Sequence, residues 1–492
     1  MAFEIPEINF FVVAPVIIAA STAMLLMLVE LFAPNFIKKW AAWISFLGLG
    51  IALIFSISAW FNPGATFTPL GGPPMLVADN FATFFNIIFI LTGMLTVLIS
   101  FDFLHWTGLD RPEYYMLMLL SITGMMLMGM SNDLILTFLA LELLSIPLYI
   151  MAGLAWPRPE SEESAMKYFL LGAFSSAIFV FGIALLYGAT GTTALPEIVA
   201  TIEQASPLAL AGAAFLLVGF GFKVAAVPFQ MWTPDVYEGA PTSVTAFMSV
   251  GAKVGGFAAM LRILLIALPD LGTIWVPAIA VLSALTLIIG NVTAITQQNI
   301  KRLLGYSSIA HAGFILIAVA ASANSSSGLS AALFYMFAYL FTNLGAFAVV
   351  IAMEHKIGEG VLLEDYKGLA KEYPWLAIAM TLFMLSLAGV PPTIGFAAKF
   401  YVFRAAVEAQ LVWLAIIGVI TSVVSAFYYL RVVYYMFMFD GEVEVMRRPA
   451  LVTAMVITAV VVFLFGILPA WGWSFAAEAV FQSVQSLAAL GG

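Results

Sequence analysis

The chain consists almost entirely of apolar runs that are long enough to cross a lipid bilayer. A span needs about 20 apolar residues, and fourteen runs meet that length, which leaves no room for a separate soluble domain. In hydrocarbon the backbone polar groups must bond within their own segment, so such runs fold as helices. The sequence therefore predicts an all-α polytopic membrane protein, one transmembrane domain over 1–492. The fourteen transmembrane helices are expected near 8–32, 40–61, 80–101, 114–131, 133–156, 164–189, 208–232, 241–268, 273–296, 301–321, 329–353, 374–403, 411–438 and 450–470.

Basic residues alternate between the connections. When the connections between successive spans are numbered in chain order, the odd-numbered connections contain nearly all of the basic residues and the even-numbered ones contain essentially none. Because cytoplasmic loops carry the excess of lysine and arginine, the odd connections are expected in the cytoplasm and both termini on the outer side. The residues concerned are Lys38, Lys39, Arg111, Arg158, Lys301, Arg302, Lys356, Lys367, Lys371, Arg447 and Arg448.

Prolines interrupt the seventh and twelfth runs. Pro228 lacks a backbone N–H and so removes a helical hydrogen bond near Lys223. Pro391 and Pro392 likewise leave the carbonyls of Leu387 and Ala388 without their helical donors. Paired breaks at membrane depth are typical of inverted repeats that surround a polar site. We therefore expect two inverted five-helix units, spans 4–8 and 9–13, with broken helices 7 and 12. The predicted divisions are 1–110 (a three-helix addition), 111–269, 270–440, and 441–492 (last span and tail).

Three lysines lie inside these apolar runs: Lys223, Lys253 and Lys399. A charged side chain at this depth costs roughly 2.5–3.5 kcal/mol on insertion scales, so it is usually paired and functional. Glu142, in the fifth run, provides a carboxylate of the opposite charge. Burial disfavours the charged form of a lysine and a nearby carboxylate favours it. Separating Glu142 from Lys223 is thus expected to drive a proton from Lys223 toward Lys253.

His311, in the tenth run, is a fifth candidate, because its unperturbed pKa near 6.5 suits a proton shuttle; a structural hydrogen bond between helices is the alternative. Four other charged residues lie near span ends, where snorkelling to the membrane surface or contacts with other subunits explain them. They are Glu30, Arg262, Arg404 and Arg431. Arginine cannot release its proton at working pH, so arginines are excluded as carriers.

Redox cofactors are not expected on this chain. It has no cysteine, which excludes thiolate-bound iron–sulfur and zinc sites. Only one of its three histidines lies in an apolar run, which argues against a bis-histidine haem. The net charge of −9 is spread without basic blocks, so no nucleic-acid partner is predicted.

Three segments carry a family resemblance. They read FKVAAVPFQMWTPDVYEGAPTSVTAFMSVGAKVGGFAAMLR, QQNIKRLLGYSSIAHAGF and LSLAGVPPTIGFAAKFYVF. They resemble the antiporter-like membrane subunits of respiratory complex I (NADH-quinone oxidoreductase), over about residues 80–440. Lysine at 399, where related subunits often carry glutamate, is most like the subunit N branch.

This resemblance implies a proton-translocating subunit of a redox complex in the bacterial cell (inner) membrane. Its fold would have fourteen helices with two inverted five-helix units, and both termini would be periplasmic. The relay would consist of Glu142, Lys223, Lys253 and Lys399, with His311 in the central region where the family varies. NADH, FMN, iron–sulfur clusters and quinone would be bound by other subunits. The partners would be other membrane subunits, including neighbouring antiporter-like ones.

Two other functions remain open from the sequence. A subunit of a multi-subunit cation/proton antiporter would share the broken spans and buried lysines. A stand-alone symporter would bind an organic solute at the breaks, although no specific pocket signature supports it.

Overall fold

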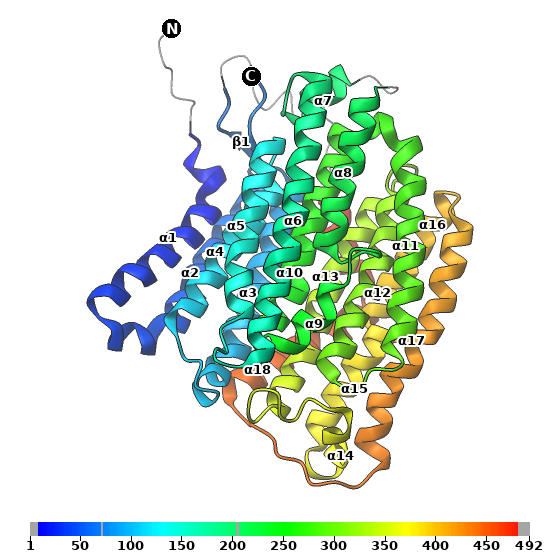
Figure 1. The fold of residues 1–492 in the computed structure, drawn as a ribbon. Helices are drawn as coiled ribbons and strands as arrows, with labels where there is room; N and C mark the ends of the chain where they lie inside the picture. Colours follow the sequence, from blue (N-terminus) through cyan, green and yellow to red (C-terminus); the bar gives the residue numbers. More distant parts are fainter. Residues whose placement is uncertain (1–7, 70–71, 203–205, 481–492) are drawn as a thin grey trace.

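The computed structural model describes residues 8–69, 72–202 and 206–480, which form a bundle of helices with one short hairpin (Figure 1). The elements are α1 (Phe10–Phe32), α2 (Pro34–Phe61), β1 (Gly64–Thr66), β2 (Leu76–Ala78), α3 (Asn80–Trp106), α4 (Pro112–Met130), α5 (Leu134–Ala152), α6 (Pro159–Thr190), α7 (Leu195–Thr201), α8 (Pro207–Val224), α9 (Trp232–Gly239), α10 (Thr242–Arg262), a π-helical turn (Ile263–Ala267), two short 3₁₀ turns (Pro269–Leu271 and Leu363–Tyr366), α11 (Gly272–Ala294), α12 (Ile300–Ala321), α13 (Gly328–Met353), α14 (Leu369–Glu372), α15 (Pro374–Ala388), α16 (Ile394–Glu408), α17 (Val412–Met438), α18 (Pro449–Ile467) and α19 (Pro469–Glu478). The strands pair antiparallel.

The prediction of an all-α polytopic membrane protein is confirmed. Within the described chain, 13 helices are long and apolar enough to cross a membrane. Most begin and end within a few residues of the predicted runs, although α2 begins at Pro34 and not near residue 40. The run predicted at 374–403 forms two shorter helices, α15 and α16. Of the predicted tail, residues 481–492 lie outside the described part.

Local sequence signals start the helices. The side chains of Asp79, Asp133 and Asn299 accept hydrogen bonds from backbone N–H groups in the first turns of α3, α5 and α12. These bonds satisfy donors that a helix start otherwise leaves unpaired. Proline occupies the first position of α4, α6, α8, α15 and α18, where its missing N–H costs no helical bond.

Three helices form the centre of the bundle. In the most apolar window of α12, 94% of residues are buried, and in α13 all are. The span of α10 with its π-helical turn is also 94% buried, whereas α2 and α18 are only 33% and 28% buried. The outer helices therefore present apolar side chains to lipid, and α10, α12 and α13 are packed on all sides by protein.

Two interruptions fall inside this bundle. α8 ends at Val224, and the chain passes through Ala225, which has a left-handed φ of 60°, before α9 begins. α15 ends at Ala388, and Gly389 follows with a φ of +85° before α16 begins. α8 starts at the end of the bundle that carries α7, and α15 starts at the opposite end, near α14 (Figure 1). The two interrupted helices thus approach the middle of the bundle from opposite ends.

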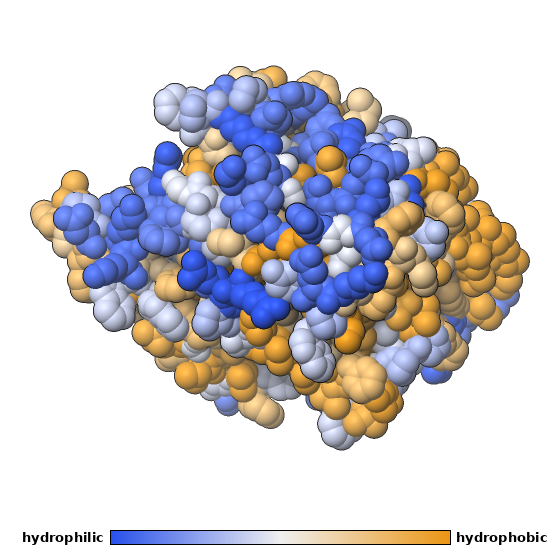
Figure 2. Space-filling model, turned by 90° about the horizontal axis from the view of Figure 1, so that it is seen from below, coloured by the Kyte–Doolittle hydropathy of each residue, from blue (hydrophilic) through white to orange (hydrophobic). Residues whose placement is uncertain are grey.

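The two ends of the bundle differ in chemistry. We call the end near α14 the basic end, because the chain segments there, the start of α12 and the connections from α13 to α14 and from α17 to α18, contain Lys301, Arg302, Lys356, Lys367 and Arg447. Hydrophilic residues gather across this end, with apolar residues around them (Figure 2).

Both ends of the described chain lie at the other end of the bundle (Figure 1). The Asn9 N–H donates to Thr66 Oγ1 on β1 (2.8 Å). Asn80, directly after β2, donates to the Glu478 carbonyl (3.4 Å). The N- and C-terminal parts of the bundle therefore lie on one side, opposite the basic end.

Candidate functional site

Lys223 lies in the last turn of α8, directly before the first interruption. Its side chain is buried, and Nζ donates a hydrogen bond to Ser145 Oγ on α5 (2.6 Å). The unpaired carbonyls at a helix C-terminus favour a cation at this position. At the break the carbonyl of Phe222 accepts hydrogen bonds from the Ala225 N–H (3.1 Å) and from Trp232 Nε1 (3.1 Å). A short polar site therefore forms where the helix ends.

Glu142 lies on α5, less than one turn before Ser145, and is half-buried. It accepts a hydrogen bond from Ser176 Oγ on α6 and lies near enough to Lys223 to interact with its charge. Among the described residues, no direct ion pair joins the two. A small cavity, roughly the size that one water molecule occupies, is lined by Ser145, Ser176 and Lys223. Hydroxyl groups thus separate the predicted carboxylate and amine.

Lys253 lies on α10 in the centre of the bundle. Its side chain is 3% exposed, and Nζ donates to Ser308 Oγ on α12. The same hydroxyl accepts a hydrogen bond from Tyr339 on α13 (2.8 Å) and lies 3.4 Å from the hydroxyl of Tyr237 on α9. Nζ also lies 5.9 Å from the centre of the Tyr237 ring. One serine therefore joins the lysine to two tyrosines from different helices.

His311 lies less than one turn after Ser308 on α12 and is buried. Its Nδ1 lies 2.7 Å from the Tyr335 hydroxyl, and its Nε2 lies 3.2 Å from the Tyr429 hydroxyl. Its ring centre is 5.1 Å from that of Tyr339. The histidine thus occupies both ring nitrogens in hydrogen bonds and stands beside the Lys253 site.

Lys399, in the second turn of α16, reaches back to the second interruption. Nζ donates to the Ala388 carbonyl (2.8 Å), which the break leaves free as the prolines predict, and to Ser422 Oγ on α17 (2.8 Å). The ammonium also lies 4.7 Å from the centre of the Phe314 ring, an attractive cation–π geometry. Lys223 therefore lies on the helix before its break, whereas Lys399 lies on the helix after its break.

A second small cavity joins His311 to this break. It is lined by His311, Tyr335, Tyr339, Thr342, Ser386, Leu387, Gly395 and Ala398, among others. Phe314 lies between His311 and Lys399, with its ring centre 6.2 Å from the imidazole. The charges of Lys253 and Lys399 both reach His311. The structure thus brings Lys253, His311 and Lys399 together, and Glu142 and Lys223 form a pair beside them.

Hydroxyl groups that the sequence did not predict hold these side chains. Ser145, Ser308, Tyr339, Tyr335 and Tyr429 each bond directly to a predicted site residue or to its partner. Helical spacing could have indicated some of them. Ser308 precedes His311 by three residues, and the two tyrosines of α13 are four residues apart, so each pair shares one face of its helix.

The prediction for Arg262 is wrong. Its position near a span end predicts a side chain that snorkels to the membrane surface or contacts another subunit, but it is only 1% exposed. Its Nη2 pairs with Asp79 Oδ1 (2.7 Å), and its Nε donates to the Gly129 carbonyl (2.9 Å). Arg404 is exposed near a helix end, as expected, and pairs with Glu408. The difference arises because α10 is a central helix, so even its last residue is covered by protein.

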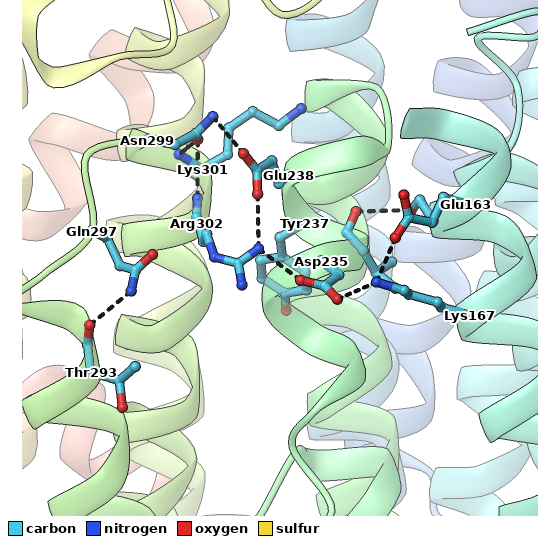
Figure 3. Close-up of polar contacts among 12 residues, drawn as sticks. Glu163, Lys167, Asp235, Tyr237, Glu238, Thr293, Gln297, Asn299, Lys301 and Arg302 are labelled. Atoms are coloured by element: carbon cyan, nitrogen blue, oxygen red, sulfur yellow. Dashed lines mark hydrogen bonds and ion pairs between the residues drawn. The ribbon is translucent and has the colours of Figure 1, made fainter. Parts of the chain in front are cut away.

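A separate ion cluster lies at the basic end (Figure 3). Asp235 on α9 pairs with Lys167 on α6 (2.6 Å) and with Arg302 on α12 (2.7 Å). Glu163 pairs with Lys167, and Glu238 pairs with Arg302 (2.9 Å). Burial raises the pKa of Asp235, but the hydrogen bonds from its two cations outweigh burial and lower the pKa below its usual value. We call these five residues the α9 ion cluster.

Comparisons with known proteins agree on the family. The family model "NADH:quinone oxidoreductase/Mrp antiporter, TM" matches residues 131–425. The chain is 45% identical to NADH-quinone oxidoreductase subunit N of Chloroflexus aggregans over 501 residues, covering all of both chains. It is also 45% identical to the subunit N of Trichlorobacter lovleyi, covering 96% of this chain and 97% of that one.

Solved structures show the same fold. A chain of respiratory complex I from Thermus thermophilus with bound aureothin is 36% identical, with a TM-score of 0.81 over 94% of this chain and 99% of that one. A chain of the Mrp complex from Dietzia sp. DQ12-45-1b has a TM-score of 0.87 over 98% of this chain and 100% of that chain at 20% identity, which is a likeness of fold alone.

Proposed function

The chain belongs to the NADH:quinone oxidoreductase/Mrp antiporter family of membrane subunits, and we propose that its buried lysines, Glu142 and His311 form a proton relay. The chain is a proton-translocating membrane subunit of NADH-quinone oxidoreductase, as its full-length relatives named subunit N indicate. That identity favours the redox complex over the cation/proton antiporter, whose matched chain shares only the fold. The stand-alone symporter has no support from any of these relatives.

The observation that carries the relay is how the three ammonium groups are held. Each is buried, and each donates to a neutral serine hydroxyl. The pKa of a buried lysine amine without a direct carboxylate partner changes when a nearby charge moves, so the amine then gains or loses a proton. Withdrawal of Glu142 from Lys223 would therefore release a proton toward Lys253. Arrival of that proton at Lys253 would in turn repel the one held on Lys399.

The arrangement of helices in the membrane supports a finer proposal. The thirteen long helices, together with α15 and α16 as one broken span, give fourteen crossings. Spans 4–8 (α4, α5, α6, α8 and α10) and 9–13 (α11, α12, α13, α15–α16 and α17) would be the inverted units, because α8 and α15 approach the centre from opposite ends. The divisions 1–110, 111–269, 270–440 and 441–492 follow from this grouping. The basic end would face the cytoplasm, and both termini would be periplasmic.

The chemistry of electron transfer would belong to other subunits. NADH, FMN, iron–sulfur clusters and quinone would be bound by them, and quinone reduction there would supply the driving force. The partners of this chain would be other membrane subunits of the complex, including neighbouring antiporter-like ones. The complex would reside in the bacterial inner membrane.

The relay is tested by replacing its first members. Lys223→Ala or Glu142→Ala in the intact complex is expected to leave assembly largely unchanged but to reduce proton pumping together with quinone reduction. Both are measured in inside-out membrane vesicles, as proton uptake from the medium and NADH oxidation. Lys356→Ala, an exposed lysine, is the matched control and should behave as wild type. A normal ratio of protons to electrons at normal rates in the Lys223 variant would exclude the proposed role.

A further inference from the structure

A second group of buried charges lies at the basic end, outside the proposed relay. Glu354, the residue directly after α13, is completely buried, and Lys301 in the first turn of α12 is 1% exposed. Glu354 Oε1 accepts the Gly358 N–H (2.7 Å), but Oε2 has no hydrogen-bond partner in the described protein. Lys301 Nζ donates to the Ala240 carbonyl (2.7 Å). The two residues are thus buried charges whose bonding capacity is incompletely used.

The surrounding chain holds this group in place. The segment after α13 folds over the start of α12, with hydrogen bonds from Ile300 N to Val361 O and from Leu363 N to Gln298 O (both 2.8 Å). Trp106 donates its indole N–H to the Glu354 carbonyl (3.3 Å). Lys301 and Arg302 extend in different directions from the start of α12, and among the described residues Lys301 forms no ion pair with the α9 ion cluster (Figure 3). It forms no direct ion pair with Glu354 within the described residues.

The charged and titratable groups around the pair come from several elements. Glu354, Arg158 and Glu238 act on the charge of Lys301. The Arg158 guanidinium packs against Gly358, whose N–H binds Glu354. Tyr366 is fully buried and lies near Glu354, and its hydroxyl has no hydrogen-bond partner in the described protein. His355, next in the chain, pairs with the surface residue Glu359. A purely structural ion pair would bring the two opposite charges into contact, which this group does not do.

A polar stripe leads from this group to the relay. Thr242, Thr245, Ser249 and Lys253 follow one another on α10 at spacings of three, four and four residues, so they share one face of the helix. All three hydroxyl residues are completely buried. The stripe begins two residues after Ala240, the acceptor of Lys301. At a rise of 1.5 Å per residue its length is about 16 Å.

The stripe has unused hydrogen-bonding capacity as well. Asn343 on α13 donates to Ser249 Oγ (2.6 Å), while its own Oδ1 has no partner in the described protein. Thr242 Oγ1 is likewise buried without one. Most buried polar groups in proteins are bonded, so oxygens of this kind are suited to bind water. Hydroxyl groups and water together can pass a proton along a chain of hydrogen bonds.

We propose that Glu354 and Lys301 form a proton-uptake site at the basic end and that the α10 stripe conducts protons from it to Lys253. This inference rests on the proposed relay function. A proton from the aqueous side binds Glu354 Oε2 as an O–H bond forms. That O–H bond then breaks as the proton passes toward Thr242, and the carboxylate is restored. No electron is transferred, so the step balances with the proton alone.

Glu354→Gln in the intact complex is the first test. It keeps an oxygen to accept the Gly358 N–H but cannot take up a proton. Proton uptake by inside-out vesicles and the coupled NADH oxidation are expected to fall together by about tenfold or more, since a positioned proton carrier contributes roughly 10²-fold or more. Glu354→Asp should recover part of the loss. Glu359→Gln, five residues away and half-exposed, is the matched control and should match wild type.

Thr242→Val and Ser249→Ala test the stripe without removing a charge. Each is expected to slow proton uptake while the amount of assembled complex stays normal. Thr453→Val, on the lipid-facing side of α18, is their control. If Glu354→Gln fails to assemble, these two variants decide the question, and wild-type rates in both would overturn the proposal.

Lys253→Ala separates this inference from the relay itself. Loss of pumping in Lys253→Ala with wild-type rates in Glu354→Gln would overturn the uptake site and leave the relay standing. Wild-type pumping in Lys253→Ala would remove the relay and the uptake site together. The expected result is that Lys253→Ala and Glu354→Gln both lose proton pumping and that Glu354→Asp recovers part of it.

Discussion

Arg262 and Asp79 form the most deeply buried ion pair among the described residues, with side chains 1% and 12% exposed. Removing one partner of such a pair leaves the other charge buried and uncompensated. Arg262→Leu is therefore expected to destabilise the subunit by about 3–5 kcal/mol. The thermal unfolding midpoint of the purified complex would report the loss.

The control for this variant is Arg404→Leu. Its pair with Glu408 is exposed, and exposed pairs contribute about 0–1 kcal/mol. A second substitution, Asp79→Asn, should restore part of the stability lost in Arg262→Leu, because it neutralises the stranded carboxylate. Equal midpoints for the Arg262 and Arg404 variants would contradict the structural role assigned to the buried pair.

At this scale the sequence predicts which residues are unusual but not what they bind. Lys223, Lys253 and Lys399 stand out because an ammonium in an apolar run is costly. Their serine partners are 78, 55 and 23 residues away along the chain, on other helices. Serine is common in helix contacts, so nothing in the sequence singles these out. The burial of Arg262 was not predictable for the same reason, since its partner Asp79 precedes it by 183 residues.

The break between α15 and α16 directly positions Lys399, whose ammonium binds the Ala388 carbonyl. Gly389 adopts a left-handed conformation, which costs other residues roughly 1–2 kcal/mol. A Cβ at this position would lie 2.7 Å from Lys399 Cδ. Gly389→Ala should therefore displace Lys399 from the Ala388 carbonyl and reduce coupled NADH oxidation in vesicles.

Gly50→Ala is the matched control, because a Cβ at Gly50 on α2 meets nothing within 4 Å. The amount of assembled complex should be similar for the two variants. If Gly389→Ala retained wild-type turnover, the precise placement of Lys399 by this break would not matter for function.

Element positions were largely predictable, because each membrane crossing is a long apolar run with polar ends. The prolines also indicated both interruptions. The sequence did not reveal α9, which follows the first break and carries Trp232, Asp235 and Tyr237. These residues contact the Lys223 break, the α9 ion cluster and the Lys253 site, respectively. Its eight residues are too few and too polar for the span criterion to detect.

The α9 ion cluster connects α6, α9 and α12 at the basic end. The pKa of Asp235 is lowered by folding, so the cluster stabilises the protein at neutral pH and loses this effect as the pH falls through that lowered value. Asp235→Asn should accordingly lower the unfolding midpoint at pH 7. The difference in unfolding midpoint between Asp235→Asn and wild type should shrink below pH about 4, because there the Asp235 carboxyl of the unfolded chain also binds a proton.

The effect will be modest, because Asp235 and Arg302 are each about one-third exposed. Asp440→Asn is the control, since its pair with Lys371 is almost fully exposed. A difference between Asp235→Asn and wild type that persisted unchanged at low pH would show that packing, and not charge, accounts for the variant.

For the whole molecule, the sequence indicated the membrane class and the family but not which helices are central. The hydropathy of α10, α12 and α13 lies within the range of the other spans, so hydropathy alone does not identify them as the buried core. Their polar residues face one another there, and this meeting of three helices creates the Lys253 and His311 sites. Runs of apolar residues specify crossings, whereas their order around the centre depends on contacts between distant segments.

The serines opposite the three lysines have a consequence for directionality. A hydroxyl accepts a hydrogen bond from an ammonium and can equally donate one to the uncharged amine, so it holds either form. A carboxylate in that place would fix the charge and act as a trap. In the proposed relay, serine partners of this kind would therefore not by themselves fix the direction in which a proton moves. Under this proposal, the free energy that makes proton movement unidirectional would have to be supplied by the other subunits of the complex.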